Sequence, residues 1–451
     1  MASLPVYFEQ RLVGTIHVDR GGPSFVYASG WIGLRGAFPI SLTMPLKSER
    51  FAAESFLPWA ANLLPESEQL RTLGQLLGMA RSDVIGLLSA IGGDTAGALS
   101  FGQAGRASSV QWRPLGKPEE LESVIEDLPN KPFLVGEEGV SMSLAGVQSK
   151  IAVAIDGDGR ICVPMNGSPS IHILKPDSPR LPGGVQNEAF CLTLARRLKI
   201  PTPKVTTGRA GKRTFLLVKR YDRTDVGGRC RRLHQEDYCQ ALGKPPSAKY
   251  ESNRTGISGP SLKDMFDITR RHMPPTEIVR LLDMVIFNML ACNSDAHAKN
   301  YSIMIRAGNA SVAPMYDIMC GEVWENITKN LAQKIAGKNR GDHLNRTHWQ
   351  QFARECGLNP KQVIDRVNMF AKSAIVEAEL AASEVAAMPA GNNEILGQTR
   401  QAVERRARRL LEQLQEPENE AAIELIHEQP VTEPPLPCRP GQLRTTATAS
   451  S

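Results

Sequence analysis

One stretch of the sequence carries residues whose types and spacing suit phosphoryl transfer. Asp295 and Asn300 are five positions apart, in the order Asp-x-x-x-x-Asn. In a kinase catalytic loop this spacing lets the Asp accept the proton of a substrate hydroxyl while the Asn holds a magnesium ion. A second carboxylate, Asp317, follows after a short segment. Two hard oxygen ligands beside a base can hold magnesium against nucleotide phosphates, so the stretch predicts a phosphotransferase site.

The elements around this stretch are predicted to bring its residues together. Apolar residues at helical spacing between 278 and 289 predict a buried helix before the loop, with Thr276 as its cap. After the loop, alternating apolar residues in 303–305 and a glycine-containing turn predict a hairpin that returns through 311–315. Because a hairpin brings its two ends together, we expect Asp317 to lie beside the loop.

A small-residue segment further upstream predicts a phosphate-binding loop. It reads Ser143-Leu144-Ala145-Gly146-Val147-Gln148-Ser149-Lys150 and opens into a β-branched run at 151–155, with Asp156-Gly-Asp-Gly closing a hairpin. The segment is neither G-x-G-x-x-G nor Walker A, yet its backbone N–H groups and Lys150 could cradle phosphate. The alternative interpretation is an ordinary hairpin at a sheet edge.

Lys175 lies between apolar residues in a predicted strand. Such a lysine often extends its ammonium to solvent, but in a kinase it meets the α/β-phosphates and pairs with a glutamate on a helix. Glu188 begins a predicted helix of the right kind. The next hairpin ends at Lys219-Arg-Tyr221, where the hinge between two kinase lobes belongs. The basic cluster 209–232 is interpreted as a solvated hairpin edge rather than a nucleic-acid groove, because aromatics are sparse among its basic residues beyond Tyr221.

The flanking regions predict further units. Alternating strands and then three short helices are expected before residue 101, with Gly92-Gly-Asp94 as a turn. After Asp317 we expect helices at 349–356, 360–371, 374–387 and 393–415. Residues 416–451 are rich in Glu and Pro, then in Thr, Ser and Ala, which predicts a disordered tail.

Composition places the chain among globular proteins with two or three domains. Its 451 residues are 41% hydrophobic and 22% charged, and no apolar run approaches the roughly 20 residues of a membrane span. The first residues have no basic flank with an apolar core, so we expect no secretory signal. Eight scattered cysteines without a C-x-x-C pair favour reduced thiols in the cytoplasm. The net charge of +6 is mild for a nucleic-acid binder.

These residues resemble the HipA family of serine/threonine kinase toxins from bacterial type II toxin–antitoxin pairs. The similarity extends to about residue 415 and depends on several motifs taken together. They are Asn62-Leu-Leu-Pro65-Glu-Ser, Ile91-Gly-Gly-Asp-Thr-Ala-Gly97, Ser143 to Lys150, His172-Ile-Leu-Lys175, Asn187-Glu188, Arg220-Tyr-Asp-Arg223, Gln235-Glu-Asp237, Lys249-Tyr-Glu-Ser, Asp295-Ala-His-Ala-Lys-Asn300 and Tyr316-Asp317-Ile.

The resemblance implies an α+β, protein-kinase-like fold with two lobes. An extra N-terminal α+β subdomain would span residues 1–110, a mixed β N-lobe 111–243 and a mainly helical C-lobe 244–415, before the tail 416–451. It also implies a kinase that phosphorylates an aminoacyl-tRNA synthetase on serine and arrests growth. A HipB-like helix-turn-helix antitoxin would neutralise it, and operator DNA would be bound through that partner.

The resemblance assigns roles to individual residues, with ATP and Mg²⁺ as cofactors. Asp295 would be the catalytic base, Asn300 and Asp317 the magnesium ligands, and Ser143 the site of inhibitory autophosphorylation. We assign the remaining residues to nucleotide binding: Lys175, Leu144, Ala145, Gly146, Val147, Gln148, Ser149, Lys150, Lys219, Tyr221, His297 and Lys299. Lys219 departs from the family, in which a Glu is expected at that position.

Two other functions compete with a toxin kinase. A small-molecule phosphotransferase of the aminoglycoside kind shares an H-x-D-x-x-x-x-N loop, but here His297 follows the Asp instead of preceding it. A catalytically weak, DNA-bound corepressor would keep only the surface that binds the antitoxin. The presence of Asp295, Asn300, Asp317 and Lys175 argues against a dead site.

Overall fold

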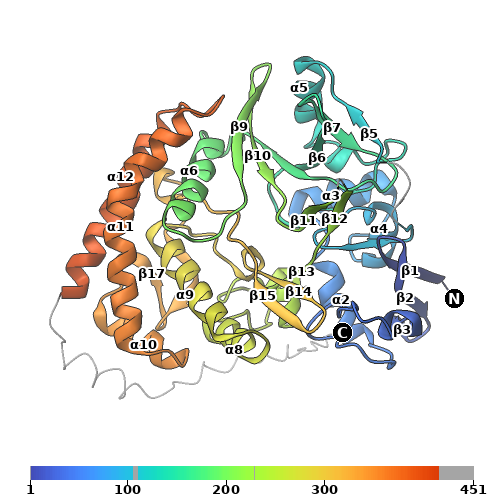
Figure 1. The fold of residues 1–451 in the computed structure, drawn as a ribbon, viewed down its shortest axis with the longest axis horizontal. Helices are drawn as coiled ribbons and strands as arrows, with labels where there is room; N and C mark the ends of the chain where they lie inside the picture. Colours follow the sequence, from blue (N-terminus) through green and yellow to red (C-terminus); the bar gives the residue numbers. More distant parts are fainter. Residues whose placement is uncertain (1, 105–109, 228, 416–451) are drawn as a thin grey trace, which may run out of the picture. The chain divides into compact units, whose positions relative to one another are not determined.

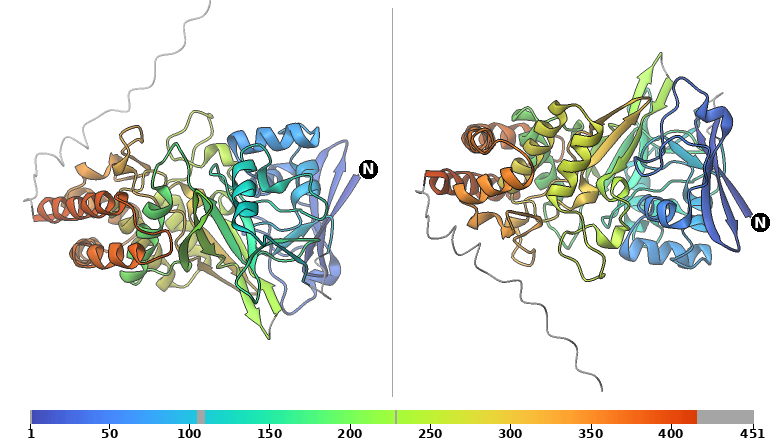
Figure 2. Two further views of the ribbon diagram at one scale, coloured as in Figure 1. Left: turned by 90° about the horizontal axis from the view of Figure 1, so that it is seen from above. Right: turned by 90° about the horizontal axis from the view of Figure 1, so that it is seen from below.

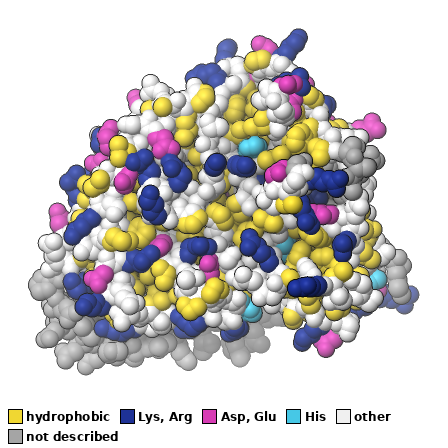
Figure 3. Space-filling model, viewed as in Figure 1, with side chains coloured by type: hydrophobic (Ala, Val, Ile, Leu, Met, Phe, Trp, Pro, Cys, Tyr) yellow, Lys and Arg dark blue, Asp and Glu magenta, His cyan; other side chains and the backbone are white. Residues whose placement is uncertain are grey.

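The computed structural model of the chain describes residues 2–104, 110–227 and 229–415 (Figure 1). The tail predicted at 416–451 lies outside the described residues. Within them, no helix is both long and apolar enough to cross a bilayer. On the face shown in Figure 3, lysine and arginine side chains are interspersed with acidic and hydrophobic ones, which suits the mild net charge.

The N-terminal domain is a four-stranded antiparallel sheet, in the order β3-β2-β1-β4, covered by short helices. Its strands are β1 (Ala2–Phe8), β2 (Arg11–Asp19), β3 (Gly22–Tyr27) and β4 (Leu99–Phe101), and its helices are α1 (Ser29–Ile32), α2 (Ala53–Ala61), α3 (Ser67–Leu77) and α4 (Val84–Ile91). Phe25 of the sheet stacks on Phe56 of α2 with ring centroids 5.9 Å apart, and both side chains are fully buried. The predicted alternation of strands and then helices is confirmed.

The second unit is a six-stranded sheet, in the order β5-β7-β6-β8-β10-β9. Its elements are β5 (Trp112–Pro114), α5 (Pro118–Asp127), β6 (Ile151–Ile155), β7 (Ile161–Pro164), β8 (His172–Pro176), α6 (Gly184–Arg197), β9 (Val205–Ala210) and β10 (Arg213–Lys219). Helix α6 packs against β9 and β10, so the helix that carries Glu188 lies beside the strand that carries Lys175. Glu188 was predicted to begin this helix, whereas the helix begins one turn earlier, at Gly184.

The remaining elements are helices together with three small antiparallel sheets. They are β11 (Arg223–Val226), β12 (Arg229–Arg232), β13 (His234–Asp237), α7 (Tyr238–Ala241), α8 (Leu262–His272), α9 (Pro275–Leu290), β14 (Ser302–Arg306), β15 (Asn309–Val312), β16 (Asn330–Ile335), β17 (Lys338–Arg340), α10 (Arg346–Glu355), α11 (Pro360–Ala386) and α12 (Ile395–Gln415). Strands β13, β14 and β15 form one sheet, which confirms the predicted hairpin after the catalytic loop. Both views in Figure 2 place α11 and α12 at the opposite end of the described residues from the N-terminal sheet.

Two details of the predicted helices are wrong. Helix α9 begins at Pro275 after an extended Pro274, and no side chain caps it, so Thr276 is not the cap. Proline suits a first helical position because its missing N–H would have no helical partner there. The helices predicted at 360–371 and 374–387 are one helix, α11, because neither Gly nor Pro interrupts the chain between them.

The basic cluster 209–232 is not a solvated edge throughout, which corrects the sequence interpretation. Arg220, Arg223 and Arg232 are at most 5% exposed and surround two equally buried carboxylates, Asp94 and Asp222. A guanidinium has a fixed fork of donors that can bind carboxylates and backbone carbonyls together, so burial of arginine is possible when acceptors surround it. The cluster interpretation failed because it took no account of Asp94, an acid from the N-terminal domain.

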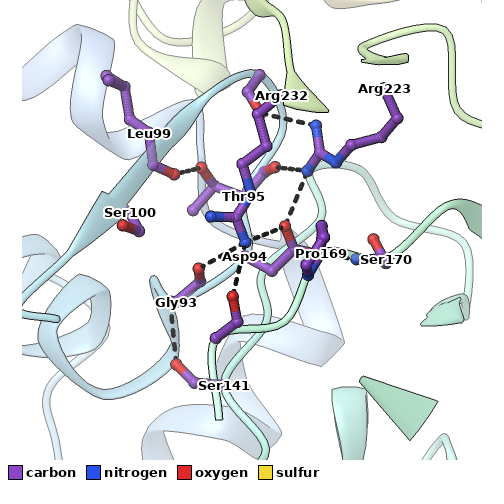
Figure 4. A network of polar contacts seen from close by, with 12 residues as sticks. Gly93, Asp94, Thr95, Leu99, Ser100, Ser141, Pro169, Ser170, Arg223 and Arg232 are labelled. Atoms are coloured by element: carbon purple, nitrogen blue, oxygen red, sulfur yellow. Dashed lines mark hydrogen bonds and ion pairs between the residues drawn. The ribbon is translucent and has the colours of Figure 1, made fainter. Parts of the chain in front are cut away.

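Asp94 is the centre of this arginine cluster. Figure 4 shows Arg223 and Arg232 converging on its carboxylate, at 2.8 Å and 3.1 Å, and the Ser170 N–H donates to it at 3.1 Å. Burial opposes ionisation of Asp94, but the charges of these arginines outweigh it and hold its pKa far below the usual range. The predicted turn at Gly92-Gly-Asp94 therefore supplies the N-terminal domain with an anchor for the hairpin β11–β12.

Candidate active site

A cleft of about 920 Å³ collects the predicted site residues. The residues predicted to bind nucleotide or metal, and the predicted base Asp295, all line it. These are Leu144, Ala145, Gly146, Val147, Gln148, Ser149, Lys150, Lys175, Lys219, Tyr221, Asp295, His297, Lys299, Asn300 and Asp317. The predicted autophosphorylation residue, Ser143, is not among the residues that line the cleft.

The catalytic loop is held by a chain of side-chain amides at the end of α9. Asn293 donates to the Asn288 side chain at 2.8 Å and accepts the Asp295 N–H at 3.1 Å. Further along, the Asn300 side chain donates to the Asp295 carbonyl at 2.8 Å. A buried helix and these hydrogen bonds fix the backbone on both sides of Asp295. The amide oxygen of Asn300 is the atom of that side chain that could bind a cation.

Asp295 extends into the cleft, where the Tyr250 hydroxyl donates to its carboxylate. Desolvation by the surrounding residues raises its pKa above the ordinary value, the Tyr250 hydrogen bond opposes this, and the negative charge of Asp317 adds to it. His297 is buried, with Nε2 3.8 Å from Asp295 Oδ1, and burial lowers its pKa far below the usual range. A pKa lowered in this way makes His297 a weak base, which leaves Asp295 as the group of this loop suited to accept a proton.

Lys175 joins two carboxylates at the rear of the cleft. Its Nζ lies 2.6 Å from Glu188 Oε1 and 2.5 Å from Asp317 Oδ1. Burial alone would lower the pKa of Lys175, but the charges of Asp317 and Glu188 outweigh it and raise the pKa. The pKa of Asp317 is held well below its usual range, since the charges of Lys175 and Lys150 outweigh its burial. The predicted pairing of Lys175 with Glu188 is confirmed.

The backbone at Asp317 has a left-handed conformation, with φ +56°. For a residue other than Gly this conformation costs of order 1 kcal/mol, and such residues gather at ligand sites. The hairpin β14–β15 returns the chain so that Asp317 lines the same cleft as Asp295 and Asn300, in line with the sequence prediction, and its carboxylate also faces Lys175.

The predicted phosphate-binding loop turns sharply at Gly146, whose φ is +107°. A Cβ there would lie 2.7 Å from Lys150 Nζ, the flexible end of a side chain that could shift, so it is the positive φ that requires glycine. Lys150 donates to the Ala145 carbonyl at 2.8 Å. Burial lowers its pKa to about 8, and the repulsion from Lys175 acts in the same direction against the attraction of Asp317.

Ser143 immediately precedes this loop and is fully buried. Its hydroxyl donates to the Leu63 carbonyl of the N-terminal domain at 2.8 Å. In this conformation the hydroxyl is shielded from the cleft, so phosphorylation of Ser143 would require the loop to move.

Two other predicted nucleotide-binding residues already have partners. The Lys299 ammonium lies 2.7 Å from Asn62 Oδ1 and 3.0 Å from Asp237 Oδ2. The Tyr221 hydroxyl donates to the Gln235 side chain, and its ring packs 5.6 Å from that of Tyr316. Both residues line the cleft, but their polar atoms support neighbouring elements.

Asp317 and Asn300 fit a magnesium ion in part. Among residues 2–104, 110–227 and 229–415, no cluster of three or more His, Cys, Asp or Glu side chains is placed to hold a metal. Magnesium usually keeps several waters and binds through one or two carboxylates plus substrate phosphates. One ionised carboxylate and one amide oxygen suit that mode of binding, in which the nucleotide completes the coordination.

Sequence reasoning missed several residues that complete the cleft, among them Asn62, Glu66, Gln69, Lys249 and Tyr250. Glu66 accepts a hydrogen bond from the Lys249 ammonium at 2.8 Å, and Gln69 donates to the Val147 carbonyl at 3.0 Å. Four of these five residues, all except Gln69, lie in motifs that carry the family resemblance, so the sequence did contain a signal. The spacing of these residues does not by itself match a catalytic or binding motif. Their hydrogen-bond partners lie far away in the sequence.

Comparisons with known proteins agree with this geometry. The family described as "HipA-like C-terminal domain" matches residues 142–378, and the one described as "HipA N-terminal domain" matches residues 4–102. The chain belongs to the HipA family. Its HipA relatives include the serine/threonine-protein kinase toxin HipA of Shewanella oneidensis, 31% identical over 346 residues, which cover 74% of this chain and 78% of that protein.

Two further comparisons extend this assignment within the HipA family. The protein Y4mE of Sinorhizobium fredii is 36% identical over 375 residues, which cover 81% of this chain and 88% of the relative. The structure of Shewanella oneidensis HipA, solved with HipB and its operator DNA, superposes with a TM-score of 0.79 at 27% identity, over 91% of this chain and 97% of that one. This HipA-family chain is therefore a kinase with a protein-kinase-like fold, as the sequence predicted.

Proposed function

We propose that the protein is an ATP-dependent serine/threonine protein kinase that acts as the toxin of a toxin–antitoxin pair in the cytoplasm. The observation that carries this proposal is the arrangement of one cleft. Lys175 is bonded to Glu188 and Asp317 at its rear, and Asp295 and Asn300 line the same cleft. This is the set of groups that phosphoryl transfer from a nucleotide requires.

In the proposed reaction, the hydroxyl oxygen of a substrate serine forms a bond to the γ-phosphorus of ATP. The bond between that phosphorus and the bridging oxygen of ADP breaks, and Asp295 takes the hydroxyl proton. Lys175, Lys150 and the N–H groups of residues 144–150 hold the phosphates. Asn300 and Asp317 would hold magnesium, which supplies positive charge against the phosphate oxygens when bound.

The proposed partners follow from the relatives. Shewanella oneidensis HipA has been solved with HipB and operator DNA, so we propose a HipB-like helix-turn-helix antitoxin for this chain. Contact with operator DNA would be indirect, through that antitoxin, which suits the mild net charge of +6. We propose a translation component, an aminoacyl-tRNA synthetase, as the protein substrate, on the resemblance stated above.

Autophosphorylation of Ser143 would inhibit the kinase. A phosphoserine adds about −1.5 to −2 charges at neutral pH and is too large to remain hydrogen-bonded in the buried position of the Ser143 hydroxyl. The loop would move away and could no longer hold the nucleotide phosphates. Mass spectrometry after incubation with magnesium-ATP should find phosphate on Ser143 in the wild-type protein and none in Asp295→Asn.

The decisive test compares Asp295→Asn with a matched control, Asp158→Asn, in an exposed turn between β6 and β7. Transfer of radioactive phosphate from ATP to a protein substrate should fall at least about 100-fold in the first variant and stay at the wild-type rate in the second. Equal rates in both variants would refute the assignment of the base.

The metal assignment has a separate test. Asn300→Ala and Asp317→Ala should weaken ATP binding measured by calorimetry with magnesium present, and much less without it. Equal losses under the two conditions would show that these residues only support the structure.

A further inference from the structure

The turn between α2 and α3 belongs to the N-terminal domain but reaches the phosphotransferase cleft. It spans residues 62–66, and Asn62, Leu63 and Leu64 are at most 3% exposed. Asn62 and Glu66 line the cleft together with Gln69, which lies in the first turns of α3. A part of the chain that the catalytic motifs do not include therefore forms one wall of the site.

Three contacts tie this region to the phosphate-binding loop. The Glu66 N–H donates to the Gly146 carbonyl at 3.2 Å, and Pro65 and Gly146 form a parallel β-bridge. The Gln69 side chain donates to the next carbonyl, that of Val147, at 3.0 Å. Successive carbonyls of the loop are thus bound by the N-terminal domain, at the point where Gly146 makes the turn.

A second set of contacts ties the same turn to the catalytic loop. The Lys299 ammonium donates to Asn62 Oδ1 at 2.7 Å and to the Asn62 carbonyl at 3.1 Å. Asn62 is itself held, because its amide nitrogen donates to the carbonyls of Pro58 and Lys244, each at 2.8 Å. Lys299 immediately precedes Asn300, so this anchor lies next to the proposed metal ligand.

We propose that Asn62 and Gln69 are positioning residues of the kinase site, Gln69 for the phosphate-binding loop and Asn62 for the end of the catalytic loop. This inference rests on the proposed kinase activity and adds the N-terminal domain to the active site. Neither residue is required to touch the reacting atoms. Each one acts by fixing the backbone that presents nucleotide-binding or metal-binding groups.

The physical reason is the cost of ordering a loop that contains glycine and small residues. Fixing the backbone of one residue costs about 1–2 kcal/mol, and glycine has the most freedom to lose. A loop that is already held in its binding conformation does not incur this cost when nucleotide binds. Loss of the Gln69 hydrogen bond should therefore weaken nucleotide binding, whereas loss of the Asn62 anchor should slow the chemical step.

The first experiment compares three variants of α3. Gln69→Ala removes the hydrogen bond to the loop, Gln69→Glu keeps the shape but cannot donate when ionised, and Gln75→Ala is the control on the exposed side of the same helix. We expect KM for ATP and Kd for magnesium-ATP to rise about three- to tenfold in both Gln69 variants, with kcat within twofold, for a hydrogen bond worth roughly 1 kcal/mol. The Gln75→Ala values should equal the wild type.

The second experiment separates positioning from stability at Asn62. Asn62→Asp keeps the side-chain oxygen that accepts from Lys299 but loses both donated hydrogen bonds. Asn62→Leu loses all three side-chain hydrogen bonds and keeps only the backbone carbonyl that accepts from Lys299. We expect both variants to have a lower melting temperature than the wild type. Only Asn62→Leu should have a lower kcat, by about tenfold, because small displacements of groups at a reacting site slow the reaction. Should Asn62→Leu retain wild-type kcat, or Asn62→Asp lose as much as Asn62→Leu, the proposed role of Asn62 is refuted.

The Gln69 variants keep the inference testable if both Asn62 variants fail to fold. An active wild-type enzyme in which Gln69→Ala, Gln69→Glu and Gln75→Ala bind magnesium-ATP equally would refute the inference for Gln69 and leave the kinase assignment intact. A wild-type protein that binds ATP but transfers no phosphate would instead refute the proposed function. In that case the calorimetric Kd values of the Gln69 variants still test whether the turn orders the loop.

Discussion

Two groups of buried charged residues differ in whether solvent can reach them. In the arginine cluster, Asp94 and Asp222 are enclosed with Arg220, Arg223 and Arg232, and all five residues are at most 5% exposed. In the lysine cluster, Lys175 bonds Glu188 in the interior, but its other partner, Asp317, has a side chain that is 29% exposed and lines the cleft.

The difference shows that burial of charge does not by itself mark a functional site. The charged groups of the arginine cluster pair with one another and with backbone groups. For example, the Gly97 N–H donates to Asp222 at 2.7 Å. The lysine cluster keeps a cation and an ionised carboxylate at a surface that a ligand can reach. A cluster that is open on one side can exchange a protein partner for a phosphate or a metal, and a closed cluster cannot.

The largest effect is expected from breaking the closed cluster. Arg223→Met leaves Asp94 and Asp222 buried with one cation fewer, which should lower the free energy of unfolding by about 3–5 kcal/mol. Urea denaturation measures this loss. The control is Arg231→Met in the same hairpin, because Arg231 is exposed and its pair with Glu9 should contribute only about 0–1 kcal/mol. If the folded Arg223→Met protein also loses ATP binding, the cluster is not purely structural.

Lys175→Met should affect catalysis rather than stability. The variant loses the cation that we propose binds the phosphates, so kcat/KM should fall at least about 100-fold, equivalent to roughly 2.7 kcal/mol of transition-state stabilisation. Glu188 can take up a proton when its partner is gone, because burial already raises its pKa, and the fold should tolerate the change. Lys212→Met, at the exposed tip of the β9–β10 hairpin, is the control for kinase assays and melting curves. A large fall in melting temperature with unchanged kcat/KM would show that Lys175 stabilises the fold and does not take part in catalysis.

Glu236 provides a third case, a buried acid whose carboxylate binds the Leu42 N–H at 2.8 Å. Burial raises its pKa to about 8, so between about pH 4.5 and 8 the folded protein binds a proton that the unfolded chain has released. This contribution to stability is fully present below the unfolded pKa and is lost as the pH rises through 8. Glu236→Gln should therefore raise the melting temperature at pH 8.5 by a few degrees and have little effect at pH 5. An equal change at both pH values would show that Glu236 does not titrate in this range.

The smallest effect concerns Lys150, in the open site. Because burial lowers the pKa of its ammonium to about 8, raising the pH from 7 to 9 removes a positive charge that faces the phosphates. A hydrogen bond from a charged donor exceeds a neutral one by about 1 kcal/mol, so KM for ATP should rise roughly fivefold over this range. Steady-state kinetics across pH test this, with Lys150→Arg as the variant whose KM should stay constant.

The sequence predicted the parts of the site whose geometry is set by neighbouring residues. Helix α9, the loop from Asp295 to Asn300 and the hairpin before Asp317 follow from local periodicity, and all three form as expected. The Lys175–Glu188 pair follows because a strand and the next helix pack together. These elements could be predicted from the sequence because each depends on a short stretch of chain.

Contacts between distant segments could not be read in this way. Gln69 binds a carbonyl 78 positions away, and Asn62 binds a lysine 237 positions away. Arg223 was assigned to a solvated edge because its burial depends on Asp94, 129 positions earlier in the chain. Local composition carries no information about such distant partners, so the proposed role of the N-terminal domain in the site could be inferred only from the fold.

The arginine cluster also has a thermodynamic consequence for the boundary between the two family regions. Asp94 belongs to the N-terminal region and the three arginines to the C-terminal one, so neither can separate without hydrating charges that now satisfy each other. A partly unfolded state with one region melted would break the ion pairs between Asp94 and the arginines, and removing one partner of such a pair typically costs several kcal/mol. The two regions should therefore lose their structure together, and calorimetry should record a single cooperative heat-absorption peak for both.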